Sequence, residues 1–63
     1  MTDIITTTDK LACVKRELLM RKRVYPRWVE DKRISEGLAT HQIACMEAIV
    51  EDYEALVVKE RLL

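Results

Sequence analysis

Two side chains of this sequence have the spacing of a metal-binding pair. His41 and Cys45 are four residues apart, which on a helix places them on one side and about one turn from each other. A structural zinc site takes four such ligands. The second cysteine, Cys13, lies far from this pair along the chain. A dimer could supply a second pair, but the spacing alone is weak evidence and a polar-edge His beside a semi-buried Cys explains the same residues, so we predict no metal and no cofactor.

Carboxylates are concentrated between residues 47 and 54, and paired carboxylates are common acid–base catalysts. At helical spacing these acids point to both flanks of the helix and do not converge. The sequence also has no nucleophile–base pair and no glycine-rich phosphate loop. We therefore predict that the protein is not an enzyme and has no catalytic residues. The acids are Glu47, Glu51, Asp52 and Glu54.

A third set of residues, the basic–aromatic group, combines Tyr25 and Trp28 with four basic residues: Arg21, Lys22, Arg23 and Arg27. Such residue types are enriched at protein interface hot spots, and they also bind nucleic acid through phosphate contacts and base stacking. A solvated helix face, with the aromatic rings packed over the loop, is the third interpretation. Zero net charge opposes a general phosphate binder. The predicted partner-binding residues are Met20, Arg21, Arg23, Val24, Tyr25, Arg27 and Trp28.

Composition and periodicity place these residues on helices. The 63 residues are 49% hydrophobic and 35% charged, with one glycine and one proline, which is typical of helical proteins. Residues 1–63 are expected to form a single domain, with residues 1–8 as a loose leader. Thr6 and Asp9 have the spacing of a capping box, and the first helix is expected over about residues 9–30.

A stripe of apolar residues predicts the buried side of the first helix. Pro26 interrupts it, because proline has no backbone N–H to donate, but Val29 returns to the angle of Leu11. We therefore predict a helix with a kink at Pro26. The alternative is a helix that ends before Tyr25. The stripe consists of Leu11, Val14, Leu18, Tyr25 and Val29.

The second helix is expected over about residues 36–61, with Ser35 as its N-cap. Besides a buried stripe, it carries a second row of apolar residues, the apolar line. Together they cover an arc of about 160°, wider than the roughly 100° of a helix that packs on one neighbour. The stripe consists of Ala39, Ile43, Met46, Val50, Tyr53 and Val57. The apolar line consists of Leu38, Cys45, Ile49 and Leu56.

A short connection makes the two helices an antiparallel hairpin, an all-α fold. We predict that a second copy covers the apolar line, giving a homodimeric four-helix bundle with the apolar line as its dimer interface. Residues 1–33 carry nine basic and five acidic residues, net +4, and residues 34–63 carry two and six, net −4. In the expected register, residue i of the first helix lies opposite roughly residue 65 − i of the second. Lys15 and Arg16 then lie opposite Glu51 and Asp52, whereas the basic–aromatic group lies opposite no acidic residue.

Parts of the chain resemble a set of short bacteriophage and prophage proteins, over about residues 10–54. The likeness is carried by the core Met-Arg-Lys-Arg-Val-Tyr-Pro-Arg-Trp-Val at residues 20–29, by Lys-Arg-Ile-Ser at 32–35 and by Ile-Ala-Cys-Met-Glu-Ala-Ile at 43–49. In these proteins a glycine often stands where this chain has Asp31 or Lys32. The resemblance implies a small phage accessory protein, and such proteins commonly bind a host protein and block it.

We therefore expect a small accessory protein that binds and modulates or inhibits a host protein through the basic–aromatic group. The alternatives are a nucleic-acid-binding or transcription-modulating protein and a component of virion assembly. No apolar run approaches the roughly 20 residues that span a bilayer, so no membrane contact is expected. Two cysteines are too few for a disulfide framework, which predicts reduced thiols and a location in the host cytoplasm.

Overall fold

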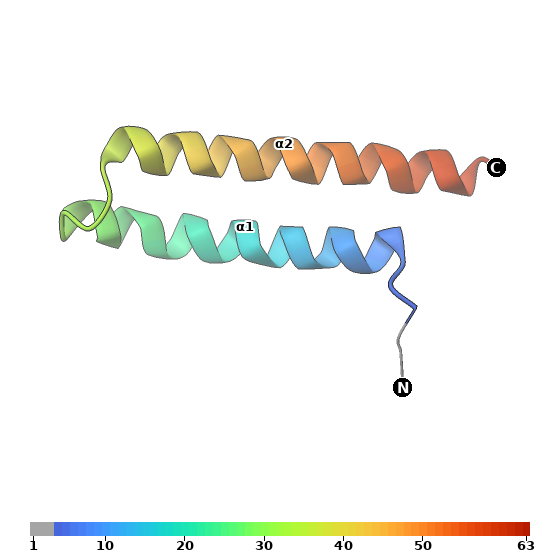
Figure 1. Cartoon of the computed structure of the whole chain (residues 1–63), viewed down its shortest axis with the longest axis horizontal. Coiled ribbons are helices and arrows are strands. Elements are labelled where there is room, and N and C mark those ends of the chain that lie inside the picture. Colours follow the sequence, from blue (N-terminus) through green and yellow to red (C-terminus); the bar gives the residue numbers. More distant parts are fainter. Residues whose placement is uncertain (1–3) are drawn as a thin grey trace.

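The computed structural model describes residues 4–63, which form two helices joined by a short loop. Helix α1 spans Thr7–Glu30 and helix α2 spans Glu36–Arg61. The two run in opposite directions and lie side by side along most of their length (Figure 1). The prediction of an all-α helical hairpin is confirmed.

The start of α1 is fixed by the predicted capping box. The backbone N–H of Asp9 donates to Oγ1 of Thr6 over 3.1 Å, and the backbone N–H of Thr6 donates to Oδ2 of Asp9 over 3.0 Å. Because a helix begins directly after its cap, Thr7 and Thr8 belong to α1 and not to a leader. Residues 1–3 of the predicted leader lie outside the described residues.

Helix α1 continues through Pro26 as far as Glu30. The proline removes one backbone hydrogen bond, but the apolar side of the helix stays in phase across it: Tyr25 is buried and Val29 half-buried. Packing on both sides of the proline therefore holds the last turn of the helix in place. The alternative in which the helix ends before Tyr25 is wrong.

The loop begins with a Schellman motif. The N–H of Lys32 donates to the carbonyl of Val29 over 3.1 Å, and the N–H of Arg33 donates to the carbonyl of Trp28 over 2.8 Å. These two bonds satisfy carbonyl groups that the end of α1 leaves free. The motif requires a left-handed residue just after the cap, and Lys32 adopts this conformation with φ of 59°.

Helix α2 begins where the sequence predicts. The hydroxyl of Ser35 accepts a hydrogen bond of 3.1 Å from the backbone N–H of Leu38, as an N-cap does. Glu36 lies in the first turn, and Lys59 and Arg61 lie in the last. Each charge therefore opposes the partial charge at its end of the helix.

The core lies along the contact between the two helices. Both predicted stripes face it, and their members are buried or half-buried. No side chain of residues 4–63 is less than 2% exposed, because a two-helix hairpin screens only one side of each helix. The buried side chains are Tyr25, Ala39, Met46, Val50 and Val57.

Two hydrogen bonds between the helices set their register. Thr7 Oγ1 donates to Glu60 Oε1 over 2.8 Å, and Tyr25 Oη donates to Gln42 Oε1 over 2.9 Å. In both pairs the residue numbers add to 67, so the predicted register of 65 is wrong by about two residues. Within residues 4–63, Lys15 and Arg16 form no ion pair with the acids opposite them.

Candidate interaction surfaces

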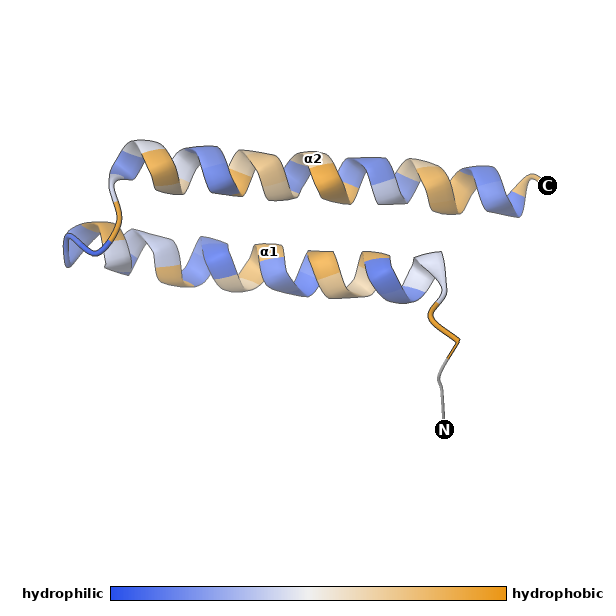
Figure 2. Cartoon of the chain, viewed as in Figure 1, coloured by the Kyte–Doolittle hydropathy of each residue, from blue (hydrophilic) through white to orange (hydrophobic). Residues whose placement is uncertain are grey.

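The apolar line is exposed on the hairpin. Leu38 is 47% exposed, Ile49 38% and Leu56 40%, and Cys45 is exposed as well. Hydrophobic residues recur along the whole of α2 (Figure 2). Among the described residues, neither helix has a stretch long and apolar enough to cross a membrane. Within residues 4–63, no other element covers this second apolar side of α2.

One side of α1 lies on the same face of the hairpin as the apolar line. At about 100° per residue, the apolar line lies about 100° from the centre of the buried stripe of α2. A set of α1 residues, the mixed line, lies about 50° to 110° from the centre of the buried stripe of α1. The direction of this rotation about the helix axis is the same as that from the α2 stripe to the apolar line. In an antiparallel pair, equal angular senses lead to the same face. The mixed line consists of Lys10, Glu17, Arg21, Val24 and Trp28.

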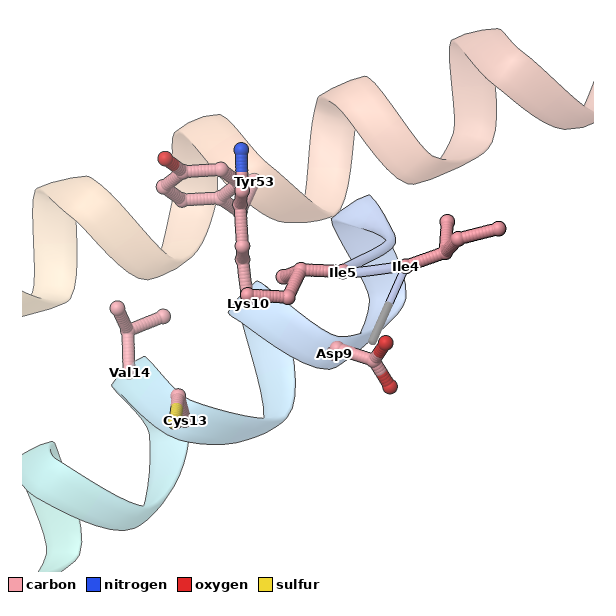
Figure 3. A pocket seen from close by; sticks show the side chains of 7 residues that line it. All are labelled: Ile4, Ile5, Asp9, Lys10, Cys13, Val14 and Tyr53. Carbon is pink, nitrogen blue, oxygen red and sulfur yellow. The ribbon is translucent and has the colours of Figure 1, made fainter. Parts of the chain in front are cut away.

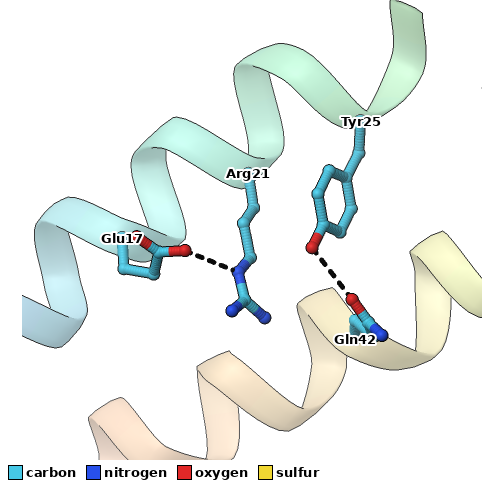
Figure 4. A network of polar contacts seen from close by, with 4 residues as sticks. All are labelled: Glu17, Arg21, Tyr25 and Gln42. Atoms are coloured by element: carbon cyan, nitrogen blue, oxygen red, sulfur yellow. Dashed lines mark hydrogen bonds and ion pairs between the residues drawn. The ribbon is translucent and has the colours of Figure 1, made fainter. Parts of the chain in front are cut away.

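Tyr25 belongs to the core and does not present a contact surface. It is 6% exposed, and its hydroxyl is bonded to Gln42 (Figure 4). Its ring stacks on that of Trp28, with centroids 5.3 Å apart, and the guanidinium of Arg21 lies 5.9 Å from the Tyr25 ring centroid, within cation–π range. Tyr25, one of the predicted partner-binding residues, is therefore too buried to contact a partner, and Trp28 is half-buried against it.

Two of the four cations in the basic–aromatic group have acidic partners. Arg21 Nε lies 3.0 Å from Glu17 Oε1, one turn earlier on α1 (Figure 4), and Lys22 Nζ lies 3.7 Å from Glu47 Oε2 on α2. The prediction that the whole group faces no acid is therefore wrong for Lys22, because the shift of about two residues in the register brings Glu47 within its reach. The Lys22–Glu47 pair is half-exposed, so it contributes at most about 1 kcal/mol.

The other two cations lie on the outer side of α1. Arg23 and Arg27 are exposed, and neither forms an ion pair within residues 4–63. Arg16 lies within about 40° of them around the helix axis and is also exposed and unpaired among the described residues. We call these three residues the arginine edge. The half-buried Met20 lies between the arginine edge and the mixed line.

His41 and Cys45 are in contact, as their spacing predicts. Cys45 Sγ lies 3.5 Å from His41 Nε2, and both residues are exposed. Among the described residues, no three His, Cys, Asp or Glu side chains gather in a group able to hold a metal ion. The pair therefore supplies two ligands of the four that a structural zinc site takes.

An open hollow lies between the helices at the end away from the loop. It is lined from α1 by Lys10, Cys13 and Val14, and from α2 by Tyr53 (Figure 3). Apolar side chains form most of its walls, and the charged members are Lys10 and Asp9. Asp9 is occupied in the helix cap, so no convergent set of polar groups faces the hollow.

Sequence reasoning missed two residues of these surfaces. Glu17 holds Arg21, and the four-residue spacing of an acid before a base on a helix was sufficient to predict this pair. Gln42 accepts the hydrogen bond of the Tyr25 hydroxyl, and at about 100° per residue it lies between the stripe and the apolar line of α2. A polar residue inside the apolar arc was a signal in the sequence, but nothing in the sequence identified Tyr25 as its partner.

The fold and its surfaces define a small all-helical hairpin with one uncovered apolar face and one basic edge. Comparison of the chain with protein-family models, with curated proteins and with solved structures finds no match.

Proposed function

We propose that this chain is a non-enzymatic binding protein that works as a homodimeric four-helix bundle. The observation that carries the proposal is the exposure of the apolar line beside a core that, within residues 4–63, has five buried side chains. A chain of this length buries only about 60% of the surface that its unfolded form exposes. Small scaffolds commonly gain stability by association, and the apolar line offers the area for it.

The apolar line packs against the second copy, and the arginine edge binds a different partner. Arg23 and Arg27 are exposed and without acidic partners among the described residues, and arginine binds carboxylates through two parallel hydrogen bonds. We propose an acidic patch on another protein as the ligand of this edge. The resemblance to phage proteins suggests that the protein carrying this acidic patch is a host protein.

The partner proposal is tested by affinity capture with two matched variants. Arg23→Glu/Arg27→Glu reverses two charges on the arginine edge, and Lys59→Glu/Arg61→Glu makes the same change in charge at the end of α2. From a host-cell lysate, we expect the wild type and Lys59→Glu/Arg61→Glu to capture one protein that Arg23→Glu/Arg27→Glu does not capture. Titration of that protein, once purified, should show affinity that falls with added salt. Equal retention by all three proteins contradicts the assignment of the edge.

Nucleic acid is a second candidate ligand for the arginine edge. Arg16, Arg23 and Arg27 extend over about 16 Å of helix, at 1.5 Å per residue, and such a row matches a phosphate backbone. Against it, Glu30 and Asp31 adjoin Arg27 in an open hollow at the end of α1. A gel-shift titration of a 20-base-pair duplex decides the matter. Binding that is steeply salt-dependent and lost in Arg23→Glu/Arg27→Glu favours nucleic acid over a protein ligand.

A further inference from the structure

The apolar line has the same spacing when read in either direction. Its members are separated by seven, four and seven residues. When two copies of α2 pack in opposite directions, Leu38 therefore lies level with Leu56 of the second copy, and Cys45 lies level with its Ile49. Such an isologous contact is what a two-fold symmetric dimer requires. The centre of the line is at Glu47.

Two pairs of residues on the mixed-line side of α1 are symmetric about the same height. The contacts between the helices place Glu47 level with residues 20 to 22 of α1. Glu17 and Val24 are equally far from a point between Met20 and Arg21, and so are Lys10 and Asp31. One two-fold axis can therefore pass through the centre of the apolar line and through the point between Met20 and Arg21 on α1. It also brings Lys10 opposite Asp31 of the second copy, a pair of opposite charges.

The competing arrangement places both loops at the same end of the bundle, with α1 of one copy over α2 of the other. In the observed register of about 67, Lys10 then lies near Leu56 of the second copy, and Glu17 lies near its Ile49. Charged side chains buried against apolar ones lose hydration without gaining a partner. With the loops at opposite ends, the apolar line of each copy meets the apolar line of the other, so no charged residue of α1 faces it. Glu17 then lies level with Val24 of the second copy, and Arg21 beside Glu17 offsets its charge.

We propose that two hairpins pack face to face with their loops at opposite ends, about a two-fold axis at the height of Met20 and Glu47. This proposal rests on the dimer of the proposed function and specifies its geometry. The arrangement sets α1 beside α1 of the second copy. The arginine edges of both copies then lie on one side of the bundle, so that a symmetric acidic ligand contacts six arginines.

Distances between spin labels on the two copies test this geometry. Arg33→Cys, in a chain with Cys13→Ser and Cys45→Ala, which keeps position 45 of the apolar line apolar, places one nitroxide at each loop. A helix of 26 residues is about 39 Å long, so dipolar EPR should give a separation of about 40 Å between the two loops. Loops at the same end give about 20 Å, the width of two packed helices with their labels, and that distance overturns the proposal.

Two further label sites complete the test. In the same background, Lys59→Cys reports the other end of the hairpin and should also give a separation above about 30 Å. Ala48→Cys lies close to the axis and should give a short separation that proves association. All three sites are exposed, and circular dichroism verifies that each variant stays helical. A helical protein with no dipolar coupling at position 48 and the mass of one chain contradicts the dimer itself, and with it the proposed function.

Discussion

The hydroxyl of Tyr25 donates a hydrogen bond of 2.9 Å to Oε1 of Gln42, linking the two helices close to the loop. The ring of Tyr25 is held between this bond and the ring of Trp28. A tyrosine that the sequence marks as a contact residue thus fixes the register of the hairpin. This packing leaves two surfaces exposed to a partner: the apolar line and the arginine edge.

Removing the Tyr25 hydroxyl should weaken the hairpin without changing its fold. Tyr25→Phe loses one hydrogen bond, and Gln42 is half-buried, so the free energy of unfolding should fall by about 1 kcal/mol. Urea denaturation at a fixed protein concentration measures it, because association makes stability concentration-dependent. Tyr53→Phe is the matched control, since the Tyr53 hydroxyl has no hydrogen bond to residues 4–63. Equal losses in the two variants exclude a stabilising role for the Tyr25–Gln42 bond.

Replacing Lys32 with glycine should stabilise the protein. Lys32 has φ of 59°, a conformation that costs a residue with a Cβ atom about 1 kcal/mol and glycine much less. Glycine also has more freedom in the unfolded chain, so the net gain of Lys32→Gly should be about 0.5 kcal/mol. Thermal and urea unfolding measure it. Lys32→Ala keeps the Cβ atom and should show no such gain; a glycine variant no more stable than this control contradicts the left-handed assignment.

Acid should loosen the start of α1 in a way that depends on Asp9. The backbone N–H of Thr6, and then its hydroxyl, hold the pKa of Asp9 below its ordinary value of 3.8. Because the folded-state pKa is lowered, the stabilisation is complete above pH 3.8 and is lost as the pH falls through the lowered pKa. An NMR titration of the Asp9 carboxyl carbon should show the low midpoint. Thr6→Ala keeps the backbone N–H and loses the hydroxyl, so the midpoint should rise only part of the way toward 3.8. Thr6→Pro loses both donors and should raise it further, and an unchanged midpoint in Thr6→Pro would sink this explanation.

The elements were predictable from the sequence because each has a local cause. The capping box at Thr6 and Asp9, the cap at Ser35 and the two apolar stripes depend only on residue types at short spacing, and the structure has all of them. The register was not predictable to better than about two residues. It is set by the length of the Schellman turn and by the Tyr25–Gln42 bond, and neither leaves a periodic trace in a single sequence.

The candidate surfaces were predictable only in part. The exposure of the apolar line follows from the width of the apolar arc on α2, and that is visible in the sequence. The basic–aromatic group was treated as one surface, whereas the structure divides it by angle: Tyr25 is in the core, Trp28 is on the mixed line, and Arg23 and Arg27 are on the arginine edge. Residues close in sequence on a helix point in different directions, so composition alone does not define a surface.

The association state of the wild type tests the account most directly, with two variants that insert one charge into exposed apolar positions of α2. Ile49 lies on the apolar line, whereas Val58, 55% exposed, lies on the opposite flank. Light scattering at micromolar concentration should give twice the chain mass of 7.4 kDa for the wild type and for Val58→Glu. Ile49→Glu should be a monomer or unfolded. A folded wild-type protein with the mass of a single chain, or an Ile49→Glu variant that still dimerises, would contradict the claim that a second copy covers the apolar line.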